Sequence, residues 1–313
     1  METRFALAKL KSLSPWSLPK GRIIRSIIMI RNHQKMIADK IRLESYRKAI
    51  IETVKPGDVV LDLGTGLGIL AFLACQAGAR KAYAIEQSQI ISVANQICWA
   101  NGFQDKVTFI KDHSTKVKLP EKVDVIITET LGTFALDENI LPSIIDARDR
   151  FLKSTGIIIP SEIELVLVAI EAETHYSVIE FWDSPLYGIN FKPARAEIAR
   201  LPHAIRIKEA ECLSDAVALK RFDLQTTNEI TLDEKISFKT KKTGILHGWG
   251  GWFEVQLTPN ISISTSPAVP ETHWKNIFLP SIVPIRVNAG DVINLHIRAV
   301  KREDHTAWWW RLA

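Results

Sequence analysis

Cysteine is scarce in this chain. Cys75, Cys98 and Cys212 are the only three among 313 residues, an odd number with no paired spacing. Disulfide frameworks and cysteine-rich metal sites need paired or clustered cysteines. We therefore expect no metal centre, and reduced thiols in a cytoplasmic protein are the simplest interpretation.

Long apolar runs are also missing. No stretch reaches the ~20 consecutive apolar residues that a membrane-spanning helix needs, and the first residues lack the apolar stretch of a secretory signal. We expect neither a membrane span nor a signal peptide. At 313 residues the chain exceeds one small core, so two domains are expected.

Acidic residues are absent between Arg4 and Gln34, in a chain of net charge +5. Residues 1–31 therefore form a basic N-terminal segment, which is either a solvated leader or an arm for an acidic partner. Its charges are not clustered as in a nucleic-acid tail, so nucleic acid is not an expected partner. Within it, Gly21–Ile30 places isoleucines at helical spacing, which suits a lid, a membrane-surface contact or a core helix.

A helix is expected over His33–Ile50. After it, apolar strands alternate with helices. Continuous apolar strands that alternate with helices are typical of a parallel, doubly wound sheet. The strands are expected at 59–63, 81–85, 107–110, 123–128 and 155–159, and the helices at 69–77, 89–101 and 139–152.

The pattern changes after Pro160. Apolar residues now alternate, which predicts a second, β-rich domain of barrel or sandwich type from about Ser161. Phe181–Pro202 departs from this alternation and reads as an excursion from the β-body. The Gly- and Trp-rich motif His247–Trp252 predicts a bulged edge strand with core tryptophans, or else an aromatic loop that faces the substrate.

Polar residues follow each of the first four strands. In a parallel sheet these carboxyl ends meet at one edge, where ligands bind. The residues are Asp62 with Gly64, Gly66 and Gly68, then Glu86, then Asp112, His113 and Ser114, and finally Glu129.

The glycine spacing separates two nucleotide-like ligands. Dinucleotide sites use Gly-x-Gly-x-x-Gly to seat a pyrophosphate, whereas this chain has Gly-x-Gly-x-Gly after Asp62. A carboxylate there repels a diphosphate but suits the ammonium of a methionine moiety, and Glu86 can accept both ribose hydroxyls. S-adenosylmethionine is therefore favoured over NAD, with a purely structural turn as the alternative.

Four motifs, in this order along the chain, resemble those of the protein arginine methyltransferase branch of the class I methyltransferases. They are the His33-x-x-Met36-x-x-Asp39-x-x-Arg42 helix, the glycine turn of Leu61–Leu70, the hairpin Thr128–Glu138 and the Thr272–Lys275 loop. The hairpin keeps two glutamates nine positions apart, Glu129 and Glu138.

The resemblance runs from about Asn32 to the C-terminus and implies the domain organisation. Residues 32–160 would form a Rossmann-like S-adenosylmethionine-binding domain and residues 161–313 a β-barrel-like substrate domain. The excursion near 181–202 falls where the family carries its dimerisation arm, which implies a head-to-tail homodimer.

The resemblance also implies residue roles. Glu129 and Glu138 would grip a guanidinium, Arg42 would bind the methionine carboxylate and hold Glu129, and Asp39 and His273 would pair across the domains. The implied cofactor-binding set is His33, Met36, Arg42, Asp62, Gly64, Gly66, Gly68, Glu86, and Asp112, His113 and Ser114 beside the adenine.

These roles are chemically coherent. A guanidinium is planar and cationic, and carboxylates bind it through forked hydrogen bonds. Two carboxylates fix its plane, so the acceleration of methyl transfer would come from positioning and electrostatics rather than from a strong base. The Asp39–His273 pair would either receive the released proton or serve as a structural link.

Two departures from the family bear on the acceptor. Arg22–Arg31 carries no aromatic residue where the family has tyrosines, and Thr130-Leu131 replaces a common Trp-Met pair. We predict a methyltransferase acting on a guanidino nitrogen of a peptide, a protein or a metabolite. The alternatives are a methyltransferase of another N- or O-nucleophile and a catalytically silent scaffold.

Overall fold

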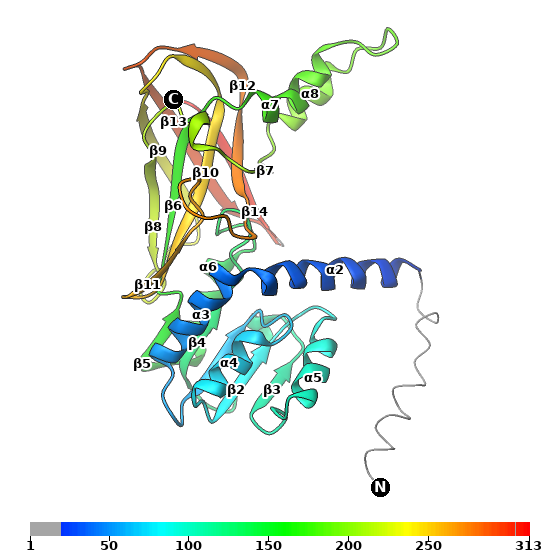
Figure 1. Ribbon diagram of the computed structural model, residues 1–313, viewed down its shortest axis with the longest axis vertical. Coiled ribbons are helices and arrows are strands. Elements are labelled where there is room, and N and C mark those ends of the chain that lie inside the picture. The colour runs from blue at the N-terminus through cyan, green and yellow to red at the C-terminus, as the bar shows by residue number, and fades with distance from the viewer. Residues whose placement is uncertain (1–19, 304) are drawn as a thin grey trace.

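The computed structural model describes residues 20–303 and 305–313, with the backbone alone for residues 20–28. Two bodies are stacked along the long axis, an α/β layer and a taller body of antiparallel sheets (Figure 1). The basic segment was expected over residues 1–31, and its first 19 residues lie outside the described residues. From Lys20 onward it belongs to helix α2 (Lys20–Ala38), which runs between the two bodies (Figure 1).

A parallel five-stranded sheet forms the centre of the α/β layer, as the sequence predicts. Strands β1 to β4 begin and end where the apolar runs do, and β1 is buried at every position. The strands are β1 (Val59–Leu63), β2 (Lys81–Ile85), β3 (Val107–Ile110), β4 (Val123–Thr128) and β5 (Leu152–Ile159), in the order β3-β2-β1-β4-β5. Strand β5 starts earlier than expected, directly after the preceding helix.

Helices cover this sheet, and one helix prediction was wrong. The single helix expected over His33–Ile50 is broken at Asp39, which has extended backbone angles (φ −72°, ψ 97°) and caps the next helix by accepting a hydrogen bond from Arg42 N at 3.0 Å. The helices are α3 (Lys40–Thr53), α4 (Ile69–Ala77), α5 (Ile91–Ala100), α6 (Ile140–Phe151) and the short η2 (Ser114–Lys116).

Two antiparallel sheets build the barrel-like body. Their orders are β7-β12-β10-β6-β8, with β11 on β10, and β14-β13-β9. The strands are β6 (Glu162–Ile170), β7 (His203–Ile205), β8 (Val217–Asp223), β9 (Leu232–Lys239), β10 (Gly244–Thr258), β11 (Ile261–Ser264), β12 (Asn276–Val287), β13 (Val292–Lys301) and β14 (Thr306–Leu312).

The Gly- and Trp-rich motif lies in β10, which pairs with β6 on one side and β12 on the other. The expected bulge is present between Leu246 and Gly248, and Trp249 and Trp252 are buried. The expectation of an edge strand was wrong, because β10 is central. The motif is therefore part of the barrel core and not a loop that faces a substrate.

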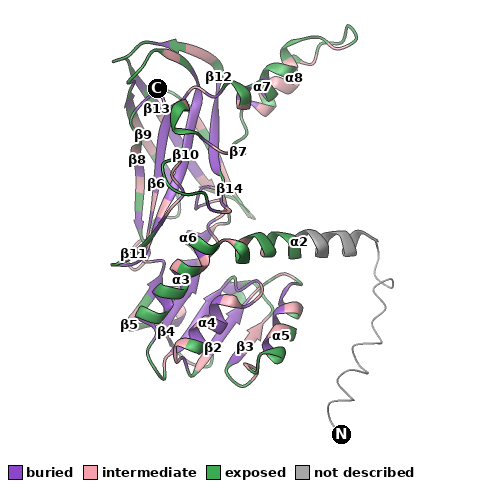
Figure 2. Cartoon of the chain, viewed as in Figure 1, coloured by how far each residue is buried: buried purple, intermediate pink, exposed green. Residues whose placement is uncertain are grey.

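One continuous apolar core joins the two bodies. Buried residues fill the sheet of the α/β layer and the inner faces of the barrel (Figure 2). Phe134, from the loop after β4, is fully buried and packs against the Trp308 ring of β14, with ring centroids 5.1 Å apart. This shared core fixes the bodies relative to each other, so residues from both can contribute to one site.

A helical arm leaves the barrel between β6 and β7. It contains α7 (Glu173–Glu180), the short η3 (Phe181–Asp183) and α8 (Lys192–Ile198), and it projects away from both bodies (Figure 1). The arm therefore begins earlier than the excursion predicted at 181. A short η4 (Glu209–Glu211) follows β7. None of the helices that the structure describes is both long and apolar enough to cross a membrane.

Candidate functional site

The glycine turn lies between β1 and α4, under the last turns of α2. Gly64, Gly66 and Gly68 all have left-handed backbone angles, with φ of 77°, 55° and 88°. A Cβ on Gly66 would lie 2.6 Å from Cε1 of His33. The turn thus needs glycine both for its conformation and for the close approach of α2.

Asp62 organises this turn from behind. Its buried carboxylate accepts hydrogen bonds from Thr65 Oγ1 at 2.5 Å and from Ala71 N at 3.0 Å, and burial raises its pKa to about 6. Asp62 does not line the cavity above the turn. The sequence led us to expect a direct contact with a methionine ammonium. In the structure both of these hydrogen bonds use Oδ2 and join the turn to the first turn of α4.

Glu86 follows β2 and reaches the same turn. Its carboxylate accepts hydrogen bonds from Gly66 N at 3.2 Å and from Ser88 N at 2.7 Å. His33 and Met36 of α2 cover the turn from above and line, with Gly64 and Gly66, a cavity of about 30 Å³. Burial lowers the pKa of His33, and the negative charge of Glu86 opposes this shift.

The residues after β3 lie apart from this cavity. Asp112 and His113 are exposed, and the Asp112 carboxylate accepts a hydrogen bond from His113 N at 2.7 Å. His113 Nδ1 lies 2.8 Å from Thr115 Oγ1 and caps η2. Ser114 is buried, and its carbonyl accepts a hydrogen bond from Arg150 Nη2 at 2.8 Å. These three residues do not line the cavity above the glycine turn.

A buried ion pair connects α3 to the end of β4. Arg42 Nε donates to Glu129 Oε2 at 2.6 Å and Arg42 Nη2 donates to the same oxygen, while Arg42 Nη1 donates to the carbonyl of Met36 at 3.1 Å. Arg42 is 3% exposed and Glu129 is 7% exposed. Burial raises the pKa of Glu129, and Arg42 opposes that shift by stabilising the carboxylate. Since both bonds use Oε2, Arg42 leaves Oε1 for another partner.

Glu129 and Glu138 line one cavity of about 370 Å³. Its wall comes from α2, from the loop 129–138 and from the His273–Lys275 segment of the barrel. Glu138 is open to this cavity, but desolvation by the walls, then the nearby carboxylates of Glu129, Asp137 and Glu86, raise its pKa to about 7. The two glutamates that the sequence pairs therefore do meet in space.

Asp137, which the sequence reading missed, holds the loop that carries Glu138. Its Oδ2 accepts hydrogen bonds from Thr133 N at 2.9 Å and Phe134 N at 2.8 Å, and its Oδ1 accepts one from Trp308 Nε1 at 3.0 Å. The last bond ties the loop to β14. The only local signal was an acidic residue next to Glu138.

Asp39 and His273 pair across the two bodies, as expected. His273 Nδ1 lies 2.9 Å from Asp39 Oδ2, and His273 N donates to the same oxygen at 2.7 Å. Burial opposes ionisation of Asp39, but the hydrogen bonds from His273 and from Arg42 N outweigh it and lower the pKa of this carboxyl. His273 also lines the cavity of Glu129 and Glu138.

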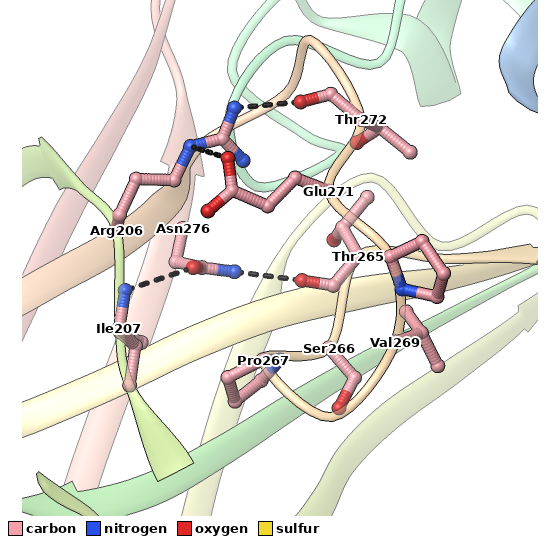
Figure 3. Close-up of a pocket in the computed structure, with 10 residues that line it drawn as sticks. Arg206, Ile207, Thr265, Ser266, Pro267, Val269, Glu271, Thr272 and Asn276 are labelled. Carbon is pink, nitrogen blue, oxygen red and sulfur yellow. Dashed lines mark hydrogen bonds and ion pairs between the residues drawn. The ribbon is translucent and has the colours of Figure 1, made fainter. Parts of the chain in front are cut away.

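Arg206 clamps the loop that carries His273, and the sequence contains no sign of this role. Its Nη2 donates to the carbonyl of Thr272 at 2.6 Å, and its Nε lies 3.6 Å from Glu271 Oε2 (Figure 3). Its Nη1 donates to the carbonyl of Trp274. Beside it, Asn276 accepts a hydrogen bond from Ile207 N and donates to the Thr265 carbonyl (Figure 3). The loop geometry is thus set by the barrel.

No cluster of three or more His, Cys, Asp or Glu side chains arranged to hold a metal ion occurs among the described residues. What the cavity offers is a pair of carboxylates beside a glycine turn. Such a pair can bind a planar cation by charge-assisted hydrogen bonds.

Comparison with known proteins supports the fold and places the chain in a family. A family model described as the arginine methyltransferase oligomerization subdomain matches residues 162–312, and one for ribosomal protein L11 methyltransferase matches residues 42–175. Protein arginine N-methyltransferase 1 of Schizosaccharomyces pombe is 31% identical over 270 residues, which cover 83% of this chain and 79% of that protein. The chain belongs to the protein arginine N-methyltransferase family.

Two further members of the family are similar to this chain. Protein arginine N-methyltransferase 2 of Mus musculus is 34% identical over 85% of this chain, and this chain spans 63% of that relative's length. The solved Trypanosoma brucei PRMT1 enzyme–prozyme heterotetrameric complex with AdoHcy contains a chain that is 27% identical, with a TM-score of 0.79. That match covers 87% of this chain and 88% of the other.

We predict that Asp137→Ala destabilises the protein and impairs the site. Three donors lose their acceptor, so the free energy of unfolding should fall by roughly 2–4 kcal/mol. Trp308→Phe, which removes only the indole N–H, should cost less, and Asp149→Ala at an exposed ion pair should be near neutral. Urea unfolding measures all three, and equal losses for Asp137→Ala and Asp149→Ala would contradict the prediction.

Proposed function

We propose that this chain transfers a methyl group from S-adenosylmethionine to a guanidino nitrogen. The observation that carries this proposal is the pair Glu129 and Glu138, which face one cavity beside the glycine turn while Arg42 binds only one oxygen of the first. Two carboxylates that face one cavity are suited to a cationic, planar acceptor.

The residues around the glycine turn fit the cofactor. A Cβ on Gly66 would fill the space under His33, and Glu86 stands at the end of the neighbouring strand. We assign cofactor binding to His33, Met36, Arg42, Glu86 and the glycine turn, with Asp62 shaping that turn. S-adenosylmethionine supplies an electrophilic methyl group, and the T. brucei relative was solved with AdoHcy.

The chain's own contribution is to hold the acceptor. Glu129 and Glu138 would each accept hydrogen bonds from the guanidinium and so fix its plane. The attraction between these charges is stronger in a partly desolvated cavity than in water. Arg42 keeps Glu129 oriented. His273 lies at the wall of the same cavity and is paired with Asp39, and this pair would accept the proton that the acceptor loses.

We also propose a homodimer formed through the helical arm. Phe181, Tyr187 and Ile189 of the arm are exposed, and the family model that covers this region is described as an oligomerization subdomain. A second copy would cover these apolar side chains. The finer interpretation, a head-to-tail arrangement, rests on the family resemblance.

The thiols support a cytoplasmic location. Cys75, Cys98 and Cys212 are unpaired, and burial raises the pKa of Cys75 to about 11, which keeps it protonated and unreactive. A reducing compartment is compatible with such thiols.

Glu138→Gln should abolish methyl transfer yet leave the cofactor bound. The neutral amide has one acceptor oxygen and no charge, so it binds a guanidinium far more weakly than a carboxylate does, whereas the glycine turn is untouched. Calorimetry with S-adenosylhomocysteine should therefore give an affinity near that of the unsubstituted protein, while labelled methyl transfer to guanidino acceptors falls at least 100-fold. Glu44→Gln, at an exposed carboxylate of α3 outside the cavity, is the matched control. Retained transfer by Glu138→Gln would refute the role of this residue.

The pH dependence of methyl transfer should follow the ionisation of Glu138. Its pKa is raised to about 7, and the ionised form is the one that binds a guanidinium. Acceptor kcat/KM should fall as pH decreases through about 7 and level off above it, because the proton competes with the acceptor. A profile that is flat between about pH 6 and about pH 8 would contradict this assignment.

Substitutions in the helical arm test the proposed homodimer. Ile189→Asp places a charge within the exposed apolar surface and should shift the mass measured by light scattering from two chains to one. Lys192→Ser, at an exposed polar position of the same arm, should leave two chains. A dimer that persists in Ile189→Asp, or a monomer before any substitution, would argue against the proposed interface.

A further inference from the structure

The loop that presents His273 to the acceptor cavity is held from two sides. On one side, Asp39 Oδ2 accepts a hydrogen bond from His273 N at 2.7 Å and lies 2.9 Å from the ring atom Nδ1. On the other side, Arg206 of the barrel donates to the carbonyls of Thr272, at 2.6 Å, and Trp274. The amide of His273 and the carbonyls of both its neighbours are therefore each bound to a charged side chain.

The position of Arg206 is itself set by the barrel. Ile205, the last residue of β7, pairs with Asn276 at the start of β12, and Ile207 N donates to Asn276 Oδ1 at 3.1 Å. Asn276 Nδ2 in turn donates to the Thr265 carbonyl at 2.7 Å. Both neighbours of Arg206 are thus tied to the residue at which the loop ends, so the strand pairing places the guanidinium against the loop.

Arginine suits this contact because its guanidinium is planar and presents several N–H groups at fixed angles. Two of its terminal nitrogens bind carbonyls that lie two residues apart, so one side chain fixes two peptide planes. Thr272 and Trp274 are 7% and 5% exposed, which gives water little access to replace Arg206. Since an unpaired buried carbonyl is costly, loss of Arg206 would let these peptide planes rotate toward other donors.

The same loop sets the orientation of the His273 ring. The centroid of this ring lies 4.3 Å from that of Trp274, and the Trp274 ring packs edge-on against Phe253 of β10 with centroids 5.4 Å apart. A carboxylate can only accept hydrogen bonds, so the contact with Asp39 places the ring proton on Nδ1. The other ring nitrogen, Nε2, is then the one that can accept a proton.

Resting on the proposed function, we propose that Arg206 is a positioning residue for methyl transfer and acts through His273. Arg206 does not line the cavity of Glu129 and Glu138, whereas His273 does, so Arg206 does not touch the acceptor. Its role is to hold the loop so that His273 keeps its bond to Asp39 and its Nε2 stays available for the proton that the guanidinium loses. A residue that acts only through another has no effect once the other is removed.

A double-mutant cycle on the full chain tests this coupling. Arg206→Gln should lower kcat for methyl transfer to a peptide with one arginine between glycines roughly 10- to 100-fold. The KM for this peptide should change little, because Glu129 and Glu138 still bind the guanidinium. In His273→Gln, the further change Arg206→Gln should alter kcat by no more than about twofold. An unchanged kcat in Arg206→Gln, additive losses in the cycle, or a loss in KM alone would overturn the proposal.

Arg206→Lys separates loss of charge from loss of the forked contact. Lysine keeps the charge but lacks the planar fork, so its kcat should lie between those of the unsubstituted protein and Arg206→Gln. Arg221→Gln, at an exposed barrel arginine that pairs with Glu164, is the matched control and should keep full kcat. Calorimetry with S-adenosylhomocysteine should give one affinity for all these proteins, and weaker binding by Arg206→Gln would point to general damage and against the proposal. If Arg206→Gln does not fold, Arg206→Lys replaces it in the cycle.

NMR of ¹⁵N-labelled histidine gives a readout that a purely stabilising role would not move. The His273 signal, assigned by its loss in His273→Gln, should show the proton on Nδ1 in the unsubstituted protein and a mixture of tautomers in Arg206→Gln, as the bond to Asp39 weakens. Identical His273 signals in the two proteins would contradict the proposal. Failure of this inference is distinct from failure of the proposed function, in which the unsubstituted protein itself methylates no arginine peptide.

Discussion

The rest of the site depends on one buried ion pair, between Arg42 and Glu129. A buried charge that loses its partner typically costs 3–5 kcal/mol, so the two residues must stay together. Arg42 is part of α3 and also binds the carbonyl of Met36, while Glu129 ends β4. The pair therefore holds the end of α2, the start of α3 and the acceptor loop in one arrangement.

The second constraint is the junction of the two bodies. Asp137 binds Trp308 of β14, and Asp39 binds His273 of a loop that Arg206 fixes from within the barrel. The acceptor cavity lies between these two links. Its lining residues consequently come from distant parts of the chain, and Glu138 and His273 face one cavity because the two bodies share a core.

Much of this arrangement follows from local sequence. The apolar runs predict the parallel strands, and the resemblance of the hairpin to that of the family implies that Glu129 and Glu138 meet. Other features have no local signal. The extended backbone of Asp39 arises from its bonds to Arg42 and His273, Asp62 points toward α4 because Thr65 and Ala71 supply its donors, and Arg206 is one arginine among many until the barrel brings it to Thr272. Such contacts depend on tertiary packing.

The central claim is that two carboxylates hold a guanidinium with one terminal nitrogen toward the cofactor. The most direct test is tandem mass spectrometry of an arginine-containing peptide after reaction with methyl-deuterated S-adenosylmethionine. The account predicts that the labelled methyl group lies on a terminal nitrogen of the guanidino group. A label on the α-amino group or on the carboxylate would contradict it.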